Sequence, residues 1–200
     1  MALDSFYEES ARNLNERKQK NYFKICHIAQ IVFIVIACVW AWFGFNFIPF
    51  NKEEIPSWIL FFMLLTTFIV AAVAMSTLKK RFNISYDYIC VEGEIRIAKV
   101  LNQKKRRLVA RIDPMAIIQV GDMESESYTQ LRALPGLKEV VCTPNYTAAE
   151  GKFFLYVYAQ LEGAKKLFLL ECREALLINI MQYLRRDVLD REYVPQDKKM

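Results

Sequence analysis

The sequence predicts a membrane α-helical hairpin followed by an α+β domain, in which seven antiparallel strands form a barrel or sandwich closed by a C-terminal helix. Two uncharged apolar stretches, 25–50 and 56–78, each exceed the ~20 residues that a helix needs to cross a bilayer. From residue 83 onward apolar and polar residues alternate, as is typical of strands. Residues 177–188 then show the spacing of an amphipathic helix.

The segment before the hairpin, 1–24, is predicted to be a cytoplasmic helix. Ser5 and Glu8 have the spacing of a capping box that opens a helix, and sparse apolar residues follow among charges. Such a helix would lie along the membrane surface, touch the C-terminal domain, or simply be solvated.

The hairpin is predicted to consist of a first span at 25–50, an external loop at 51–55 and a second span at 56–78. Positive residues near span ends favour the cytoplasmic side, and the loop carries only one lysine beside two glutamates. We therefore expect a multi-pass plasma-membrane protein with both termini in the cytoplasm. The residues that set this topology are Arg17, Lys18, Lys20 and Lys24 before the first span, and Lys79, Lys80 and Arg81 after the second.

Neither span has an acidic, basic or histidine side chain at mid-depth, where transporters and proton relays usually place them. The hairpin is therefore predicted to be an anchor in the lipid bilayer. Small residues in the second span would let it pack closely against the first span or against another copy of the chain, although lipid-facing alanines give the same pattern. These residues are Ala71, Ala72, Ala74 and Ser76.

The C-terminal domain is predicted to occupy 82–191, with a polar tail at 192–200. Its fifth strand follows a polar insertion, 121–136, that contains a short helix. A stripe from Leu177 to Val188 forms the closing helix, and Asp190 is expected on its solvent side together with Arg185, Arg186 and Asp187. The predicted strands are Ile84–Cys90, Ile95–Leu101, Leu108–Ile112, Met115–Val120, Leu137–Cys142, Phe153–Ala159 and Lys166–Glu171.

The strand-turn-strand Tyr86–Ile97, the basic turn 104–107 and the closing helix carry a resemblance. In these features the chain resembles an uncharacterised Gram-positive bacterial family with two membrane spans followed by a pleckstrin-homology-like (PH-like) domain, the YcxB-like layout. The resemblance implies a PH-like fold and supplies no catalytic residues. A fold alone does not define a function.

Eukaryotic domains of this fold typically hold inositol phosphates with basic residues at the first hairpin turn. Here that turn, Glu92–Glu94, carries two carboxylates that disfavour a polyphosphate. The candidate contact for an anionic lipid surface is instead the second turn, with Lys104, Lys105, Arg106 and Arg107, each worth ~1 kcal/mol near such a surface. A solvated basic turn is the alternative.

The residue inventory argues against catalysis and cofactors. The segment 82–200 has no histidine and no glycine-rich phosphate loop, and its three cysteines are widely spaced. We expect reduced, buried thiols, no metal, no cofactor and no small-molecule substrate. With 18 Lys+Arg against 16 Asp+Glu, this segment also lacks the basic excess of a nucleic-acid-binding domain.

Interaction is the function that remains. The first hypothesis is a non-catalytic cytoplasmic scaffold module that binds a protein partner or forms a homo-oligomer, because a sheet edge or a groove beside the helix can take a peptide. The second is an accessory or regulatory subunit of a membrane transport or secretion assembly. The third is an anionic-lipid surface sensor acting through 104–107.

Overall fold

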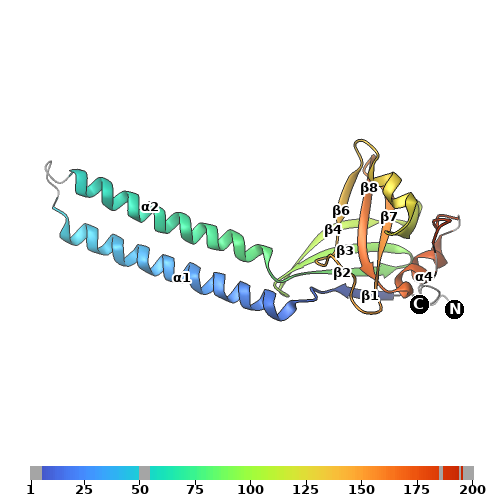
Figure 1. The fold of residues 1–200 in the computed structure, drawn as a ribbon, viewed down its shortest axis with the longest axis horizontal. Helices are drawn as coiled ribbons and strands as arrows, with labels where there is room; N and C mark the ends of the chain where they lie inside the picture. Colours follow the sequence, from blue (N-terminus) through green and yellow to red (C-terminus); the bar gives the residue numbers. More distant parts are fainter. Residues whose placement is uncertain (1–5, 50–54, 185–186, 194, 196–200) are drawn as a thin grey trace. The chain divides into compact units, whose positions relative to one another are not determined.

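A computed structural model describes residues 6–49, 55–184, 187–193 and 195, which form two compact units. One unit is the helical hairpin, Asn15–Asn83. The other joins the N-terminal segment up to Leu14 to the chain from Ile84 onward, and Figure 1 shows its strands and helices. The hairpin is therefore inserted into the sequence of the second unit.

The hairpin consists of α1 (Glu16–Phe47), α2 (Ile55–Leu78) and the short 3-10 helix η2 (Lys79–Arg81). By length and composition both long helices could cross a membrane. They pack closely at Gly44, where an added Cβ would lie 2.0 Å from Cε2 of the buried Phe61. The predicted spans are confirmed as helices, but α1 begins nine positions before residue 25 at Glu16, and residues 51–54 of the predicted loop lie outside the described residues.

The topology-determining residues lie at one end of the hairpin. Arg17, Lys18, Lys20 and Lys24 are on the first turns of α1, and Lys79, Lys80 and Arg81 form η2. The two groups share an end because the Tyr22 and Phe82 rings lie 5.7 Å apart and Lys79 donates a hydrogen bond to Gln30. This arrangement is what the charge pattern requires; the side of the membrane stays a prediction.

The predicted N-terminal helix is wrong over Phe6–Ala11, which form strand β1. This strand pairs antiparallel with β2 (Ile84–Val91), from Phe6 opposite Val91 to Ala11 opposite Tyr86. Local capping signals are weak, and here the backbone ladder offered by β2 overrides them. Ser5 of the expected capping box lies outside the described residues.

The first sheet has the order β1-β2-β3-β4, with β3 at Glu94–Leu101 and β4 at Lys105–Ile112. Glu92 and Gly93, both with positive φ, make the tight turn between β2 and β3 that the sequence predicts. In β4 the register shifts by one residue, so that Ile97 faces Ala110 while Ala98 faces Leu108. This bulge at Val109 turns Leu108 away from the core, where alternation had placed it.

The second sheet has the order β5-β7-β8-β6. Its strands are β5 (Ile117–Asp122), β6 (Lys138–Val141), β7 (Phe153–Leu161) and β8 (Ala164–Cys172). The 3-10 helix η3 (Pro114–Ala116) precedes β5, and α3 (Glu126–Arg132) lies in the predicted insertion. The expectation of purely antiparallel strands is wrong at one pair, because β6 runs parallel to β8. The connection between these two strands, residues 142–163 with β7, is long enough for a parallel pairing.

The seven predicted strands all exist, but β1 brings the described strands to eight, in two open sheets. Buried residues of both sheets form one core, which α4 (Glu174–Tyr183) covers with Leu176, Leu177 and Ile180. The confirmed architecture is therefore two apolar helices, two four-stranded sheets and a C-terminal helix.

The closing helix is shorter than predicted, and the solvent side assigned to Asp190 is wrong. After Tyr183 the chain runs beside β5: the Val120 N–H donates to the Val188 carbonyl at 2.9 Å, and the Asp190 N–H donates to Val120 at 2.8 Å. Asp190 is buried because the backbone around it pairs with the free edge of β5. Tyr193, which belongs to the predicted tail, packs against Phe153. Arg185 and Arg186, predicted on the solvent side of the helix, lie outside the described residues.

Candidate interaction surfaces

The four predicted lipid-contact residues do not form a single turn. Lys104 lies in the β3–β4 turn, whereas Lys105, Arg106 and Arg107 are the exposed first residues of β4. Successive side chains of a strand point to opposite faces, so Arg106 shares its face with Val100, and Arg107 shares the other face with Lys99. The structure therefore separates Arg106 from its two neighbours.

Arg106 also forms ion pairs with two acidic residues. Its guanidinium lies 3.1 Å from Asp87 of β2 and 3.9 Å from Glu8 of β1. Asp87 is buried and accepts a second hydrogen bond from Ser10. By contrast, Lys104, Lys105 and Arg107 make no ion pair with any other described residue. Three of the four cations are thus available to an anionic surface.

A groove of about 480 Å³ lies where the two sheets fail to close. We call it the seam groove; β4 borders it with Leu108–Arg111 and β6 borders it with Lys138 and Val140. Both strands are terminal in their sheets. The remaining lining residues are Leu161, Glu162, Lys166 and Phe168. The groove therefore has an apolar interior, charged residues on its lining and a strand edge on each side.

The positive charge of the seam groove is only partly neutralised. Lys138 and Lys166 are direct partners across the parallel β6–β8 pair, and neither makes an ion pair with another described residue. Like charges directly opposite one another destabilise a sheet. Arg111 is different, because it forms a salt bridge with Glu94. Burial alone would raise the pKa of Glu94, but hydrogen bonds from Arg96 and Arg111 hold it below its usual value.

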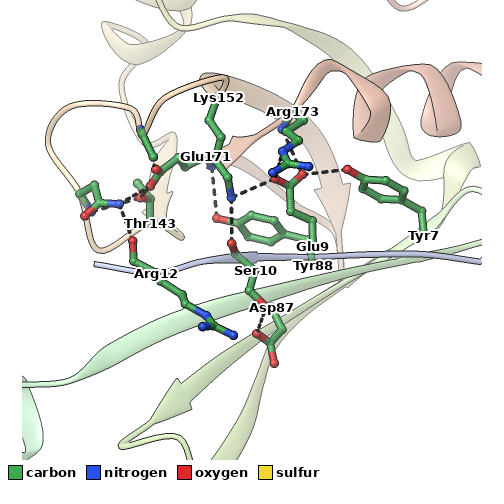
Figure 2. Close-up of polar contacts among 12 residues, drawn as sticks. Tyr7, Glu9, Ser10, Arg12, Asp87, Tyr88, Thr143, Lys152, Glu171 and Arg173 are labelled. Atoms are coloured by element: carbon green, nitrogen blue, oxygen red, sulfur yellow. Dashed lines mark hydrogen bonds and ion pairs between the residues drawn. The ribbon is translucent and has the colours of Figure 1, made fainter. Parts of the chain in front are cut away.

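A second polar cluster fastens β1 to the rest of the domain (Figure 2). Glu9 is buried, and its carboxylate lies 2.9 Å from Lys152 Nζ and accepts from the Arg173 N–H at 3.0 Å. Lys152 also donates to the Ser10 carbonyl at 2.8 Å. The Tyr7 hydroxyl donates to Glu9, and burial together with that carboxylate raises the pKa of Tyr7 to about 12.

Glu171 of β8, fully buried, is the centre of the other half of this cluster. It accepts hydrogen bonds from Thr143, from Asn145 Nδ2 at 2.7 Å and from the Ala149 N–H at 3.1 Å. Asn145 Nδ2 also donates to the Arg12 carbonyl at 2.8 Å, beyond the end of β1. These contacts hold the N-terminal segment in place, so the cluster has a structural role.

The same contacts involve Asn145 of the triplet Asn145–Thr147, which matches the acceptor pattern for N-glycosylation. Its attachment atom, Nδ2, is committed to two internal hydrogen bonds. Asn145 is therefore a structural residue of this loop.

The thiols are free, and three of them lie in the core of the domain. Burial raises the pKa of Cys142 to about 12 and holds the pKa of Cys172 well above its usual value. A thiolate is the nucleophilic and metal-binding form, so these buried thiols are unreactive. Within the described ranges no group of three His, Cys, Asp or Glu side chains is placed to hold a metal ion.

Sequence reasoning identified the basic segment but missed the seam groove and the β1 cluster. Lys138 and Lys166 become neighbours only through the parallel pairing of β6 with β8. Glu9 and Lys152 meet only because β1 joins the sheet. No local pattern marks either pair.

Two helices able to cross a membrane, joined to a two-sheet module with a C-terminal helix, fit a membrane protein that carries a PH-like domain. The chain belongs to the bacterial PH-like domain family DUF6106, whose model matches residues 4–190. This match confirms the PH-like domain that the sequence predicts, and it includes β1 and the hairpin. No curated protein and no solved structure matches the chain.

Proposed function

We propose that the chain is an integral membrane protein whose hairpin anchors a non-catalytic PH-like interaction module on the cytoplasmic face of the plasma membrane. The two basic groups at one end of the hairpin support this orientation. The module connects to the hairpin on both sides through short segments, 12–15 and 82–83. A module attached twice is well suited to present one surface to partners near the membrane.

The observation that carries the proposal is the seam groove. Exposed strand edges and apolar grooves are the surfaces on which proteins take up peptide segments. Leu108, 67% exposed, presents a large apolar side chain from an edge strand at this groove. Edge strands normally carry features that prevent chance pairing with another strand. The bulge at Val109 is such a feature in β4, whereas β6 has no bulge.

Topology is tested by placing single cysteines in the full-length chain with Cys26 and Cys38 replaced by alanine. Tyr146→Cys is fully exposed in the domain, and Ile55→Cys is exposed at the start of α2. We expect a membrane-impermeant maleimide to label Ile55→Cys in intact cells and Tyr146→Cys only after permeabilisation. Labelling of Tyr146→Cys in intact cells would overturn the cytoplasmic placement.

Recruitment is tested with a photo-crosslinking amino acid at Leu108 in cells. The matched control is Ile178, an apolar residue of α4 that is 53% exposed and lies outside the groove lining. We expect a discrete soluble partner from Leu108 and none from Ile178. Failure at both positions would contradict the proposal.

The same experiment examines the assembly hypothesis, which a second groove favours. This groove, about 580 Å³, lies between α1 and α2 and is lined by small residues that include Ala37, Ala41, Ala72 and Ser76. Small residues allow close helix packing in membranes. Cross-links from Val73, in the same groove, to other membrane subunits would support an accessory role in an assembly.

The lipid-sensor hypothesis is favoured by Lys104, Lys105 and Arg107, three cations that have no ion-pair partner in the part of the chain that the structure describes. Each would contribute ~1 kcal/mol toward an anionic surface. With full-length protein in nanodiscs, amide exchange of the β3–β4 turn should slow when anionic lipid replaces neutral lipid, and high salt should reverse this. Lys104→Glu with Lys105→Glu should abolish the difference, whereas Lys165→Glu, an exposed control on β8, should not. Equal exchange in both lipids would rule the hypothesis out.

A further inference from the structure

The two edges of the seam groove differ in how well they can pair with another strand. β4 carries a bulge at Val109, which breaks the regular ladder and bends the strand. β6 is regular: its four residues pair with β8 without a shift in register. Among the described strands β6 has a neighbour on one side only. A ladder can therefore be extended from β6, while Leu108 and Val109 of β4 offer side-chain contacts.

The charges of the groove indicate what such a strand carries. Lys138 and Lys166 stand side by side on the face of the second sheet that lines the groove, without an acidic partner among the described residues. Two residues further along each strand, Val140 and Phe168 are partners on the same face. Glu162 is the one acidic residue in the lining. A carboxylate placed beside Lys138 would relieve the repulsion between the two lysines.

We propose that the seam groove binds an extended segment of a partner protein that adds to β6 as a strand and carries an acidic residue two positions from an apolar residue. The acidic side chain lies beside Lys138, within reach of Lys166, and the apolar side chain lies beside the partly buried Val140, because strand neighbours repeat every second residue. Leu108 and Val109 cover the segment from the β4 side. This inference rests on the proposed function and names the chemistry of the partner.

The test is selection from a displayed library of random peptides on the full-length protein in nanodiscs of neutral lipid. We expect enrichment of sequences with Asp or Glu two positions from Val, Ile, Leu or Phe, and depletion of proline, which cannot donate to a ladder. Methylation of alternate backbone nitrogens in a selected peptide should abolish binding. Absence of enrichment, or enrichment of basic sequences, would overturn the proposal.

Variants of the protein test whether a selected peptide binds at the seam groove. Reversing both charges, with Lys138→Glu and Lys166→Glu, should weaken binding of a selected acidic peptide about tenfold, because it replaces attraction by repulsion at both positions. Lys165→Glu is the matched control: it is an exposed lysine of β8 outside the groove lining, and binding should stay within about twofold. Near-UV circular dichroism verifies that each variant is folded. Equal weakening by both changes would contradict a specific groove.

Two further outcomes separate this inference from others. If nanodiscs of anionic lipid protect Lys138 from acetylation while no peptide is selected, the groove contacts the membrane and the inference fails. If Leu108 cross-links no partner in cells although acidic peptides are selected, the proposed recruitment fails and the ligand class of the groove stands. A partner cross-linked in cells without any selection of acidic peptides would sink the inference and leave recruitment intact.

Discussion

The amine of Lys152, just before β7, lies 2.9 Å from the Glu9 carboxylate in β1, although the whole hairpin separates the two residues in the chain. Lys152 also donates to the backbone of Ser10. The PH-like domain therefore begins before the helical hairpin and resumes after it. Its integrity depends on contacts between segments on both sides of the insertion.

The first prediction concerns this ion pair. Glu9→Ala would remove the counter-charge of Lys152, whose side chain is only 12% exposed and would keep only the Ser10 carbonyl, and it would leave the Arg173 N–H without its acceptor. Breaking a buried pair by removing one partner is costly, so we expect a loss of about 2–4 kcal/mol in the free energy of unfolding. Urea denaturation of the full-length protein in detergent measures it. Glu8→Ala is the control, because Glu8 is more exposed and its contact with Arg106 is long, at 3.9 Å. This change should lower the free energy of unfolding by less than about 0.5 kcal/mol. Equal losses would contradict a role for the buried pair.

The second prediction is that residues 82–200 alone do not form the native domain. Without β1 the edge of β2 is uncovered, and Ala11, fully buried in the core, is missing. Glu171 and its neighbours also lose their contacts with the N-terminal segment. We expect an associating, poorly dispersed protein by size-exclusion chromatography and NMR.

A peptide of residues 6–14 added in trans should restore dispersed NMR signals, because it supplies the missing strand and the acceptor at Arg12. The same peptide with Glu9→Ala is the control and should bind more weakly. A monomeric, well-dispersed spectrum for residues 82–200 without any peptide would refute the prediction.

Local pattern was sufficient for most of the domain. Apolar patterning between turn residues placed all seven strands after residue 83, and the turn at Glu92–Gly93 was predictable because glycine readily takes the positive φ that a tight turn requires. The bulge at Val109 was not predictable, since alternation alone puts Leu108 on the same face as Ala110 and Ile112. A bulge depends on the partner strand, which the sequence of β4 does not contain.

Long-range pairing accounts for the other misses. Residues 6–11 have a helix-capping signal next to charged residues, and only the open edge of β2 makes them a strand. Asp190 looked solvent-facing on a continued helix, but the chain leaves α4 at Tyr183 to follow β5. The Lys138–Lys166 pair arises from a parallel partner that no spacing indicates. Candidate-site residues contributed by one segment were predictable; those that meet across segments were not.

The third prediction concerns Asp190 and acid stability. Its carboxylate accepts hydrogen bonds from Tyr156 at 2.8 Å and from Ser127 at 3.0 Å. Burial alone raises the pKa of Asp190, but these hydrogen bonds hold it below its usual value. Because the folded pKa is lower than the unfolded one, the stabilisation is complete above the unfolded pKa of about 3.9 and is lost as pH falls through the folded pKa.

Asp190→Asn should therefore lower the free energy of unfolding by about 1–3 kcal/mol at neutral pH, because it replaces the charged acceptor of the buried Tyr156 hydroxyl. It should also flatten the decline of stability below about pH 4. Urea denaturation at a series of pH values measures both effects. The control is Asp187→Asn, an exposed aspartate nearby, which should retain the wild-type acid profile. A parallel acid decline in Asp190→Asn would argue against this linkage.

The fourth prediction is that the Phe61 ring determines whether Gly44→Ala destabilises or stabilises the hairpin. An added Cβ at Gly44 would lie 2.0 Å from Cε2 of Phe61, which is 2% exposed, so Gly44→Ala forces the ring out of its place. Overpacking costs about 1–3 kcal/mol, against a gain of up to ~1 kcal/mol because alanine favours a helix more than glycine. The clash should win, and Gly44→Ala should destabilise the hairpin.

In a Phe61→Ala background the clash is absent, and Gly44→Ala should then be neutral or stabilising. Thermal unfolding of the four proteins of this double-mutant cycle in detergent gives the coupling between the two positions. Cys38→Ala, an exposed change on the same helix, serves as the control in both backgrounds. If Gly44→Ala has the same effect with and without the Phe61 ring, close packing at this crossing does not hold the two helices together.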